Sequence, residues 1–141
     1  MTITLTSRKE PREKIAELLG EITTLVAVYD HQVKDFGRRS PVAMVWSDGT
    51  TTLTQGYTHD WHRFWVAVLW DREDGDATED YIDDLSQAVR QKLFDNPEVA
   101  GVWDDLALLE EFSLLSYPVL DGRQYRMEQF QVLVKSICTV S

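Results

Sequence analysis

The sequence has little of what marks an exported, membrane or nucleic-acid-binding protein. Cys138 is its single cysteine, so no internal disulfide can form and nothing indicates an oxidising compartment. Only 14 Lys and Arg oppose 24 Asp and Glu, a formal charge of −10, whereas a dedicated nucleic-acid binder needs clustered cations. The longest apolar run, residues 64–70, is too short to span a membrane, and no signal-peptide core follows Met1. We therefore expect a soluble, cytoplasmic protein with no membrane partner.

Catalytic signatures are also lacking. The chain has no glycine-rich phosphate loop, dinucleotide fingerprint, G-x-S-x-G elbow or H-E-x-x-H helix. His59, Asp60 and His62 are possible metal ligands, but positions 59 and 62 of a strand point to opposite faces. The acidic segment 71–79 does not have the spacing of an EF-hand calcium loop. We expect no enzyme activity, no metal and no cofactor, and a metal-dependent hydrolase ranks third among our interpretations.

What is present indicates one α+β domain over residues 1–141. With 43% apolar residues and five tryptophans, the chain is long enough to bury the core of a single domain. Apolar residues recur at helical spacing over residues 8–24 and 78–94. Ser7 and Asp76 are the expected N-caps, because each is followed three residues later by a glutamate. These segments predict the two main helices.

The rest of the chain is rich in strand and turn signals. Asp48-Gly49 and Asp121-Gly122 stand between β-prone runs and predict hairpin turns. Residues 31–41 are polar and predict a loop. The predicted strands are residues 25–29, 42–46, 50–54, 57–70, 114–120 and 125–137. We expect a largely antiparallel sheet with the two helices packed on it and a long C-terminal β-hairpin.

Two strands have unusual patterns. Residues 57–70 are apolar at both parities, so helices, another sheet or another subunit must cover both faces. In residues 125–137 the apolar parity changes along the strand. Either a bulge near Glu128-Gln129 restores the pattern, or the hairpin extends beyond its own sheet and its two halves meet different neighbours.

The C-terminal third carries a resemblance to a known family. Gly122-Arg123-Gln124-Tyr125-Arg126 leads into residues 130–134, and a helix over residues 83–93 precedes it. Together with the order of elements, this resembles the tail terminator proteins of long-tailed double-stranded DNA bacteriophages. The resemblance implies a structural protein of the virion, in the tail or neck, assembled in the host cytoplasm. It implies a hexameric ring that caps the tail tube, ends tube polymerisation and provides a surface for head–tail joining.

The resemblance also implies partners and contact elements. The partners are further copies of the chain, the tail tube protein and a head–tail connector or stopper protein. DNA would pass through the channel without specific binding, which an acidic lining would favour. The contact elements are the loop 31–41 and the turn 121–126, and the strand 61–70 is either core or subunit interface. The candidate protein-contact residues are Arg38, Arg39, Trp61, Trp65, Arg123, Tyr125 and Arg126.

The main alternative is an acidic binding module of the immunity or inhibitor type, acting as a monomer or dimer on a basic protein. Opposite charge steers such partners together, and an aromatic anchor holds them. The oligomeric state separates this alternative from the ring.

Overall fold

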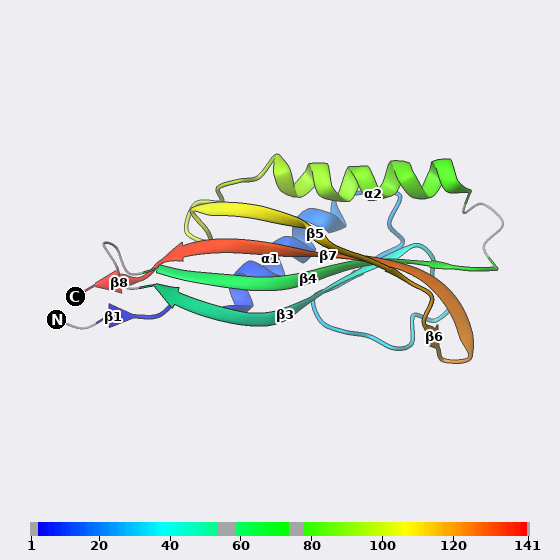
Figure 1. Ribbon diagram of the computed structural model, residues 1–141, viewed down its shortest axis with the longest axis horizontal. Helices are drawn as coiled ribbons and strands as arrows, with labels where there is room; N and C mark the ends of the chain where they lie inside the picture. Colours follow the sequence, from blue (N-terminus) through cyan, green and yellow to red (C-terminus); the bar gives the residue numbers. More distant parts are fainter. Residues whose placement is uncertain (1–2, 54–58, 74–77, 141) are drawn as a thin grey trace.

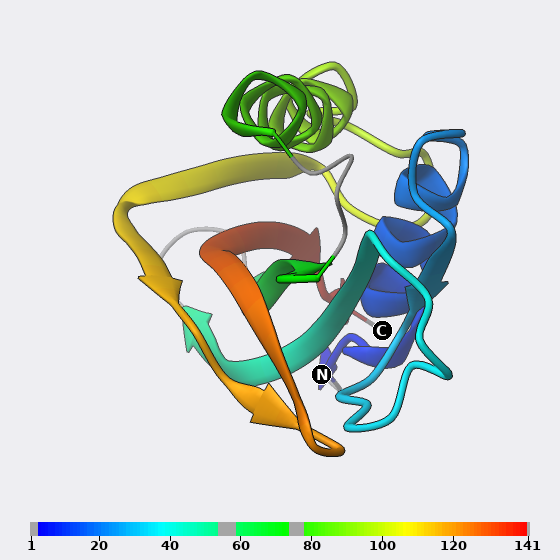
Figure 2. The ribbon, with the colours of Figure 1, turned by 90° about the vertical axis from the view of Figure 1, so that its right-hand side faces the viewer.

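Two helices pack on one face of a largely antiparallel sheet in the computed structural model, which describes residues 3–53, 59–73 and 78–140 (Figures 1 and 2). The predicted α+β class is confirmed. The helices are α1 (Lys9–Gly20) and α2 (Glu79–Phe94). The strands are β1 (Ile3–Thr4), β2 (Ala27–Tyr29), β3 (Val42–Leu53), β4 (His59–Asp71), β5 (Asp105–Ser116), β6 (Val119–Leu120), β7 (Arg123–Ile137) and β8 (Thr139–Val140).

The main sheet has the order β2-β3-β4-β7-β5, and β6 pairs with β7 beyond this path. β2 pairs with β3 in parallel, whereas the other neighbours are antiparallel. β1 and β8 form a separate two-stranded ladder. In Figure 1, α1 lies behind the sheet and α2 runs along its β5 side.

Both helices begin differently from the prediction. The N-cap of α1 is Arg8, which makes no capping hydrogen bond through its side chain, so the predicted capping box of Ser7 is wrong. The Ser7 Oγ instead accepts from the Lys9 backbone N–H at 3.0 Å, the local turn that serine competes to form. In α2 the N-cap is Thr78, and the predicted cap Asp76 lies outside the described residues.

The two Asp-Gly pairs form different structures. Asp121 and Gly122 have φ of 51° and 77° and join β6 to β7 as the predicted two-residue hairpin turn. Asp48-Gly49 does not reverse the chain, because β3 continues through it. Ser47 lies opposite Phe64 and Thr50 opposite His62, so β3 carries an extra residue relative to β4. The pair therefore forms a β-bulge, with Gly49 at φ 108°.

Both faces of β4 are buried toward its C-terminal end, as the two-sided apolar pattern predicts. On the helix side, Phe64 and Val66 pack into a core cluster with residues of α1 and α2. On the other side, Ala67 and Leu69 pack with Phe36 of the loop between β2 and β3. The chain itself thus provides the cover in this region.

β7 shows the predicted change of parity, but the bulge near Glu128-Gln129, one of the two explanations expected for it, is wrong. It pairs with β4 in unbroken register from Tyr125 to Ile137. Tyr125 belongs to the cluster around Phe36, whereas Phe130 belongs to the cluster beneath the helices. The two halves of β7 therefore bury opposite faces within one sheet. The irregularity lies in β5, between Leu109 and Leu114.

Candidate protein-contact face

Tryptophan side chains lie on the sheet face opposite the helices. Trp46 of β3 pairs with Trp65 of β4, and Trp61 lies four residues earlier on β4. Because side chains alternate along a strand, these three point away from the helices while the intervening Phe64 points into the core. All three remain partly exposed. Figure 1 is viewed from this side of the sheet, with α1 behind it.

β7 supplies the polar part of the same surface. The Lys135 ammonium lies 5.8 Å from the Trp61 ring centroid, a cation–π contact. Gln131, opposite Trp65, donates from Nε2 to Asp48 Oδ2 at 2.6 Å and so ties β7 to the bulge of β3. We name this surface the tryptophan face and define it by Trp46, Trp61, Trp65, Gln131, Leu133 and Lys135. Aromatic anchors within a polar surround are typical of protein interfaces.

Arg38 and Arg39 lie exposed on the loop between β2 and β3. The loop is fixed from below by Phe36, which is only 2% exposed. Its turn is held by two hydrogen bonds, from Gly37 N–H to Asp35 Oδ1 at 2.9 Å and from Arg39 N–H to the Phe36 carbonyl at 3.1 Å. An anchored loop therefore presents these two cations to solvent.

The Arg123 side chain forms ion pairs with residues of its own chain. Its Nε donates to Asp71 Oδ2 at 2.6 Å, and its Nη2 lies 3.1 Å from Glu73 Oε2. Burial alone would raise the pKa of Asp71, but the hydrogen bonds from Arg123 and the Glu73 backbone, together with the charges of Arg123 and Arg38, outweigh it and leave that pKa below its ordinary value. The pair joins the end of β4 to the start of β7.

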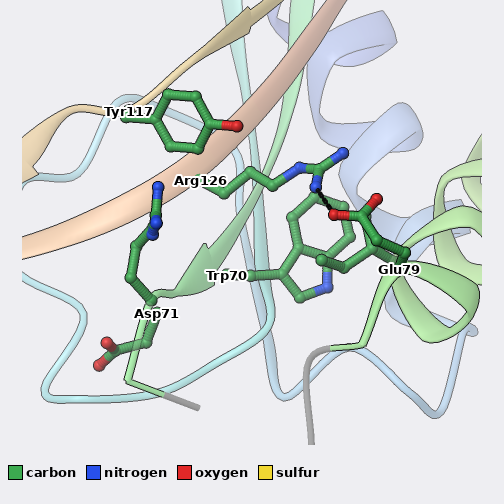
Figure 3. Close-up of a pocket in the computed structure, with 7 residues that line it drawn as sticks. Trp70, Asp71, Glu79, Tyr117 and Arg126 are labelled. Carbon is green, nitrogen blue, oxygen red and sulfur yellow. Dashed lines mark hydrogen bonds and ion pairs between the residues drawn. The ribbon is translucent and has the colours of Figure 1, made fainter. Parts of the chain in front are cut away.

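Tyr125 and Arg126 also serve the fold. Tyr125 is 2% exposed, and its ring meets Phe36 edge-on with centroids 5.2 Å apart. Arg126 Nη1 donates to Glu79 Oε1 at 2.6 Å, and its Nη2 donates to Glu128 Oε1 at 2.9 Å. Figure 3 shows the ion pair with Glu79 across a cleft that Trp70 also lines. Of the predicted residues, Arg38, Arg39, Trp61 and Trp65 are the ones that face outward.

A buried polar network lies beside the N-terminal segment. Asp60 Oδ2 accepts from the Thr6 backbone N–H at 2.8 Å and from the Thr6 hydroxyl at 2.7 Å, and Asp60 Oδ1 accepts from Thr52 at 2.6 Å. Because the Thr6 proton goes to Asp60, His62 Nε2 donates to Thr6 Oγ1 at 2.6 Å. His62 Nδ1 then accepts from Thr50 at 2.9 Å. Every polar atom of the two buried side chains is thus satisfied.

The network sets the charge states of its members. Burial would raise the pKa of Asp60, but the hydrogen bonds from Thr52 and Thr6 lower it to about 2. Burial lowers the pKa of His62, although the Asp60 carboxylate acts in the opposite direction. Burial also raises the pKa of the Cys138 thiol, whose Sγ lies 3.5 Å from Asp60 Oδ2. An ionised Asp60 beside a neutral His62 therefore fastens the segment around Thr6 to β4.

His59 and His62 lie on opposite sides of β4, as predicted: His62 is fully buried, whereas His59 contacts the Trp61 ring on the tryptophan face. Within the described ranges, no three His, Cys, Asp or Glu side chains are grouped to hold a metal ion. No helix in the same ranges is long and apolar enough to cross a bilayer.

Sequence reasoning missed two parts of this arrangement. The sequence pattern places Trp46 only at the end of a strand, whereas a continuous β3 sets it beside Trp65. The role of Thr6 was also missed, because it depends on a contact with Asp60 far along the chain. One signal was available: Thr50 and Thr52 have the two-residue spacing of Asp60 and His62, which suits facing strands.

Comparison with known proteins finds similarity in structure and none in sequence. No family model matches the sequence, and no curated protein matches it. Among solved structures, the chain is similar to one from the virion of a native gene transfer agent particle, with a TM-score of 0.49 and 16% sequence identity. The match covers 89% of this chain and 84% of that chain.

Proposed function

We propose that this chain is a structural protein of a bacteriophage virion, and that it caps the tail tube as a ring. In this role it ends tube polymerisation and provides the surface for head–tail joining. Its partners are further copies of itself, the tail tube protein and a head–tail connector or stopper protein. It acts in the tail or neck of the virion after assembly in the host cytoplasm.

The observation that carries an assembly role is the tryptophan face. Trp46, Trp61 and Trp65 gather on one side of the sheet and remain partly exposed there. A monomer gains little by keeping three large aromatic side chains at its surface, whereas an interface uses them as anchors. The more specific terminator role rests on the resemblance of residues 122–134 to that family.

We also propose that the chain acts by binding and not by catalysis. Asp60 and His62 are fully engaged with threonine hydroxyls. Asp71 is engaged by Arg123, and Glu79 by Arg126. These ionisable groups hold one segment of the fold to another and so stabilise the structure, which supports a role in binding and not in catalysis.

DNA would then pass the ring without being retained. The formal charge of −10 opposes the phosphate contacts that hold DNA on a protein. In a fluorescence anisotropy titration at physiological salt, the assembled protein should leave a labelled duplex free. Tight binding would show that cations line the channel.

Native mass spectrometry over a range of protein concentrations tests the proposal. A closed multimer, above all a hexamer, is expected. Electron microscopy should then show that the assembled protein shortens tubes grown from the cognate tail tube protein, with serum albumin as a control that leaves tube length unchanged. A strict monomer without effect on tube length would refute the ring and favour the acidic binding module.

A further inference from the structure

The main sheet has two open edges. β5 pairs with β7 on one side and with no described strand on the other. At the opposite edge, β2 pairs only with Val42–Met44 of β3, so the described part of β3 beyond Met44 has no strand partner there. Open edges of this length invite pairing or packing with another chain.

The β5 edge carries exposed apolar side chains. Leu114 and Leu115 are each 53% exposed beside a cleft that β5 shares with α2. Phe94, at the end of α2, is 70% exposed and shares a second cleft with Leu108 of β5. Val119 of the neighbouring β6 is 65% exposed. Apolar side chains gathered along one open edge indicate a surface that another protein covers.

The two edges carry opposite charge. Beside the β5 edge, Asp80, Asp83 and Asp84 are exposed on the solvent side of α2, and none forms an ion pair with a described residue. At the start of β3, the loop between β2 and β3 exposes the three cations Lys34, Arg38 and Arg39 together with one acid, Asp35.

These three cations likewise form no ion pair within the described part of the chain, whereas Lys92 pairs with Glu21 and Arg123 with Asp71. On a protein with a formal charge of −10, an unpaired basic loop suits the acidic edge of a second copy.

The first half of α2 and the loop between β2 and β3 also lie at similar positions along the long axis of the molecule. In Figure 1, the first half of α2 and the loop between β2 and β3 lie toward the same end of the long axis, on opposite long sides of the molecule. Figure 2, viewed along that axis, shows α2 at the top and the loop at the lower right. In a ring whose axis runs parallel to the long axis, each element keeps its position along that axis from copy to copy, so the first half of α2 in one copy can face the loop of the next.

We infer that the second copy in the ring docks head to tail, with the β5 and α2 edge of one copy against the β3 edge and the basic loop of its neighbour. This inference rests on the proposed ring and names its contact. The apolar side chains of β5 and β6 form the centre, and Asp83 and Asp84 of one copy meet Arg38 and Arg39 of the next at the rim. The contact is heterologous, so each copy uses both edges, and the ring closes where each contact turns the next copy by an equal fraction of a full turn.

Paired charge reversals test the contact. A helix variant carries Asp83→Lys and Asp84→Lys, and a loop variant carries Arg38→Glu and Arg39→Glu. Each alone brings like charges together at every contact, which should raise the protein concentration needed for assembly by roughly a hundredfold. An equimolar mixture should restore the ring at wild-type concentration, because opposite charges then meet wherever the two variants alternate. Native mass spectrometry should show equal numbers of the two variants in each ring.

A control variant has the same change in net charge as the loop variant, at a site outside the proposed contact. Arg8→Glu with Lys9→Glu alters the net charge as the loop variant does, but at the exposed start of α1. This control should assemble like the wild type, and circular dichroism should show that all variants are folded.

Two results would overturn the inference, and they have different consequences. If the wild type assembles and the reversed variants assemble equally well, or the mixture does not recover, the contact is wrong and the proposed ring stands. If the wild type remains monomeric at every concentration, both the contact and the ring are wrong.

Discussion

Replacing Asp60 by asparagine separates the charge of the buried carboxylate from its shape. The amide side chain introduced by Asp60→Asn would keep an oxygen toward Thr6 and turn its NH2 group toward Thr52, whose hydroxyl then accepts instead of donating. What is lost is the negative charge that strengthens each hydrogen bond. The variant is therefore expected to fold, with lower stability at neutral pH.

The size of the loss follows from the pKa. Lowering the pKa of Asp60 from 3.8 to about 2 corresponds to about 2 kcal/mol of stability at neutral pH. Because the folded-state pKa is the lower one, this stability is fully present above the ordinary pKa and is lost as the pH falls through about 2. Protonated Asp60 has almost the shape and hydrogen-bonding groups of asparagine, so the wild type should approach the variant in acid.

Urea unfolding, followed by tryptophan fluorescence at about pH 7, 4 and 2, measures this difference. Asp60→Asn should be less stable than the wild type by about 2 kcal/mol at pH 7 and by well under ~1 kcal/mol at pH 2. Glu98→Gln, at an exposed position after α2, is the matched control and should stay within about 0.5 kcal/mol of the wild type. A difference for Asp60→Asn that does not change with pH would refute the charge-based reasoning.

Other residues give further expectations. Phe64→Ala should cost about 3–5 kcal/mol in urea unfolding because its ring is fully buried, whereas Trp65→Ala should cost only about 1–2 kcal/mol because its ring is partly exposed; equal costs would contradict these placements. Arg123→Ala should lower the stability at neutral pH by leaving Asp71 buried without its cation, and thermal unfolding should show a smaller loss in acid, where that carboxylate is protonated. Cys138 should react with a thiol reagent far more slowly in the native protein than in urea, and equal rates would show that it is not buried.

Local turn chemistry predicted one reversal of the chain and mispredicted another. Asp121-Gly122 forms a hairpin because Leu120 and Arg123 can pair directly across it. Asp48-Gly49 has the same chemistry, yet β4 pairs with β3 on both sides of it, and the pair becomes a bulge. A residue that tolerates positive φ suits either outcome, so the partner strand decides.

The candidate site was predictable where it depended on alternation along one strand. Trp61 and Trp65 share a parity on β4, and the structure places both on the helix-free side. The orientation of Arg123 and Arg126 could not be predicted, because their partners Asp71 and Glu79 approach from distant parts of the sequence. A basic residue near a turn is available to another protein only if its own chain leaves it unpaired.

The pairing of β4 with β7 has a consequence for biosynthesis. It joins residues as distant in sequence as Phe64 and Val132, and both core clusters draw side chains from β7. While the chain is being made, the paired strands β3 and β4 leave the ribosome long before their central neighbour does. Until β7 emerges, the apolar side chains of β4 remain exposed to solvent, where they can aggregate or bind chaperones. Folding is therefore expected to be completed only after β7 has emerged, and then in one concerted step.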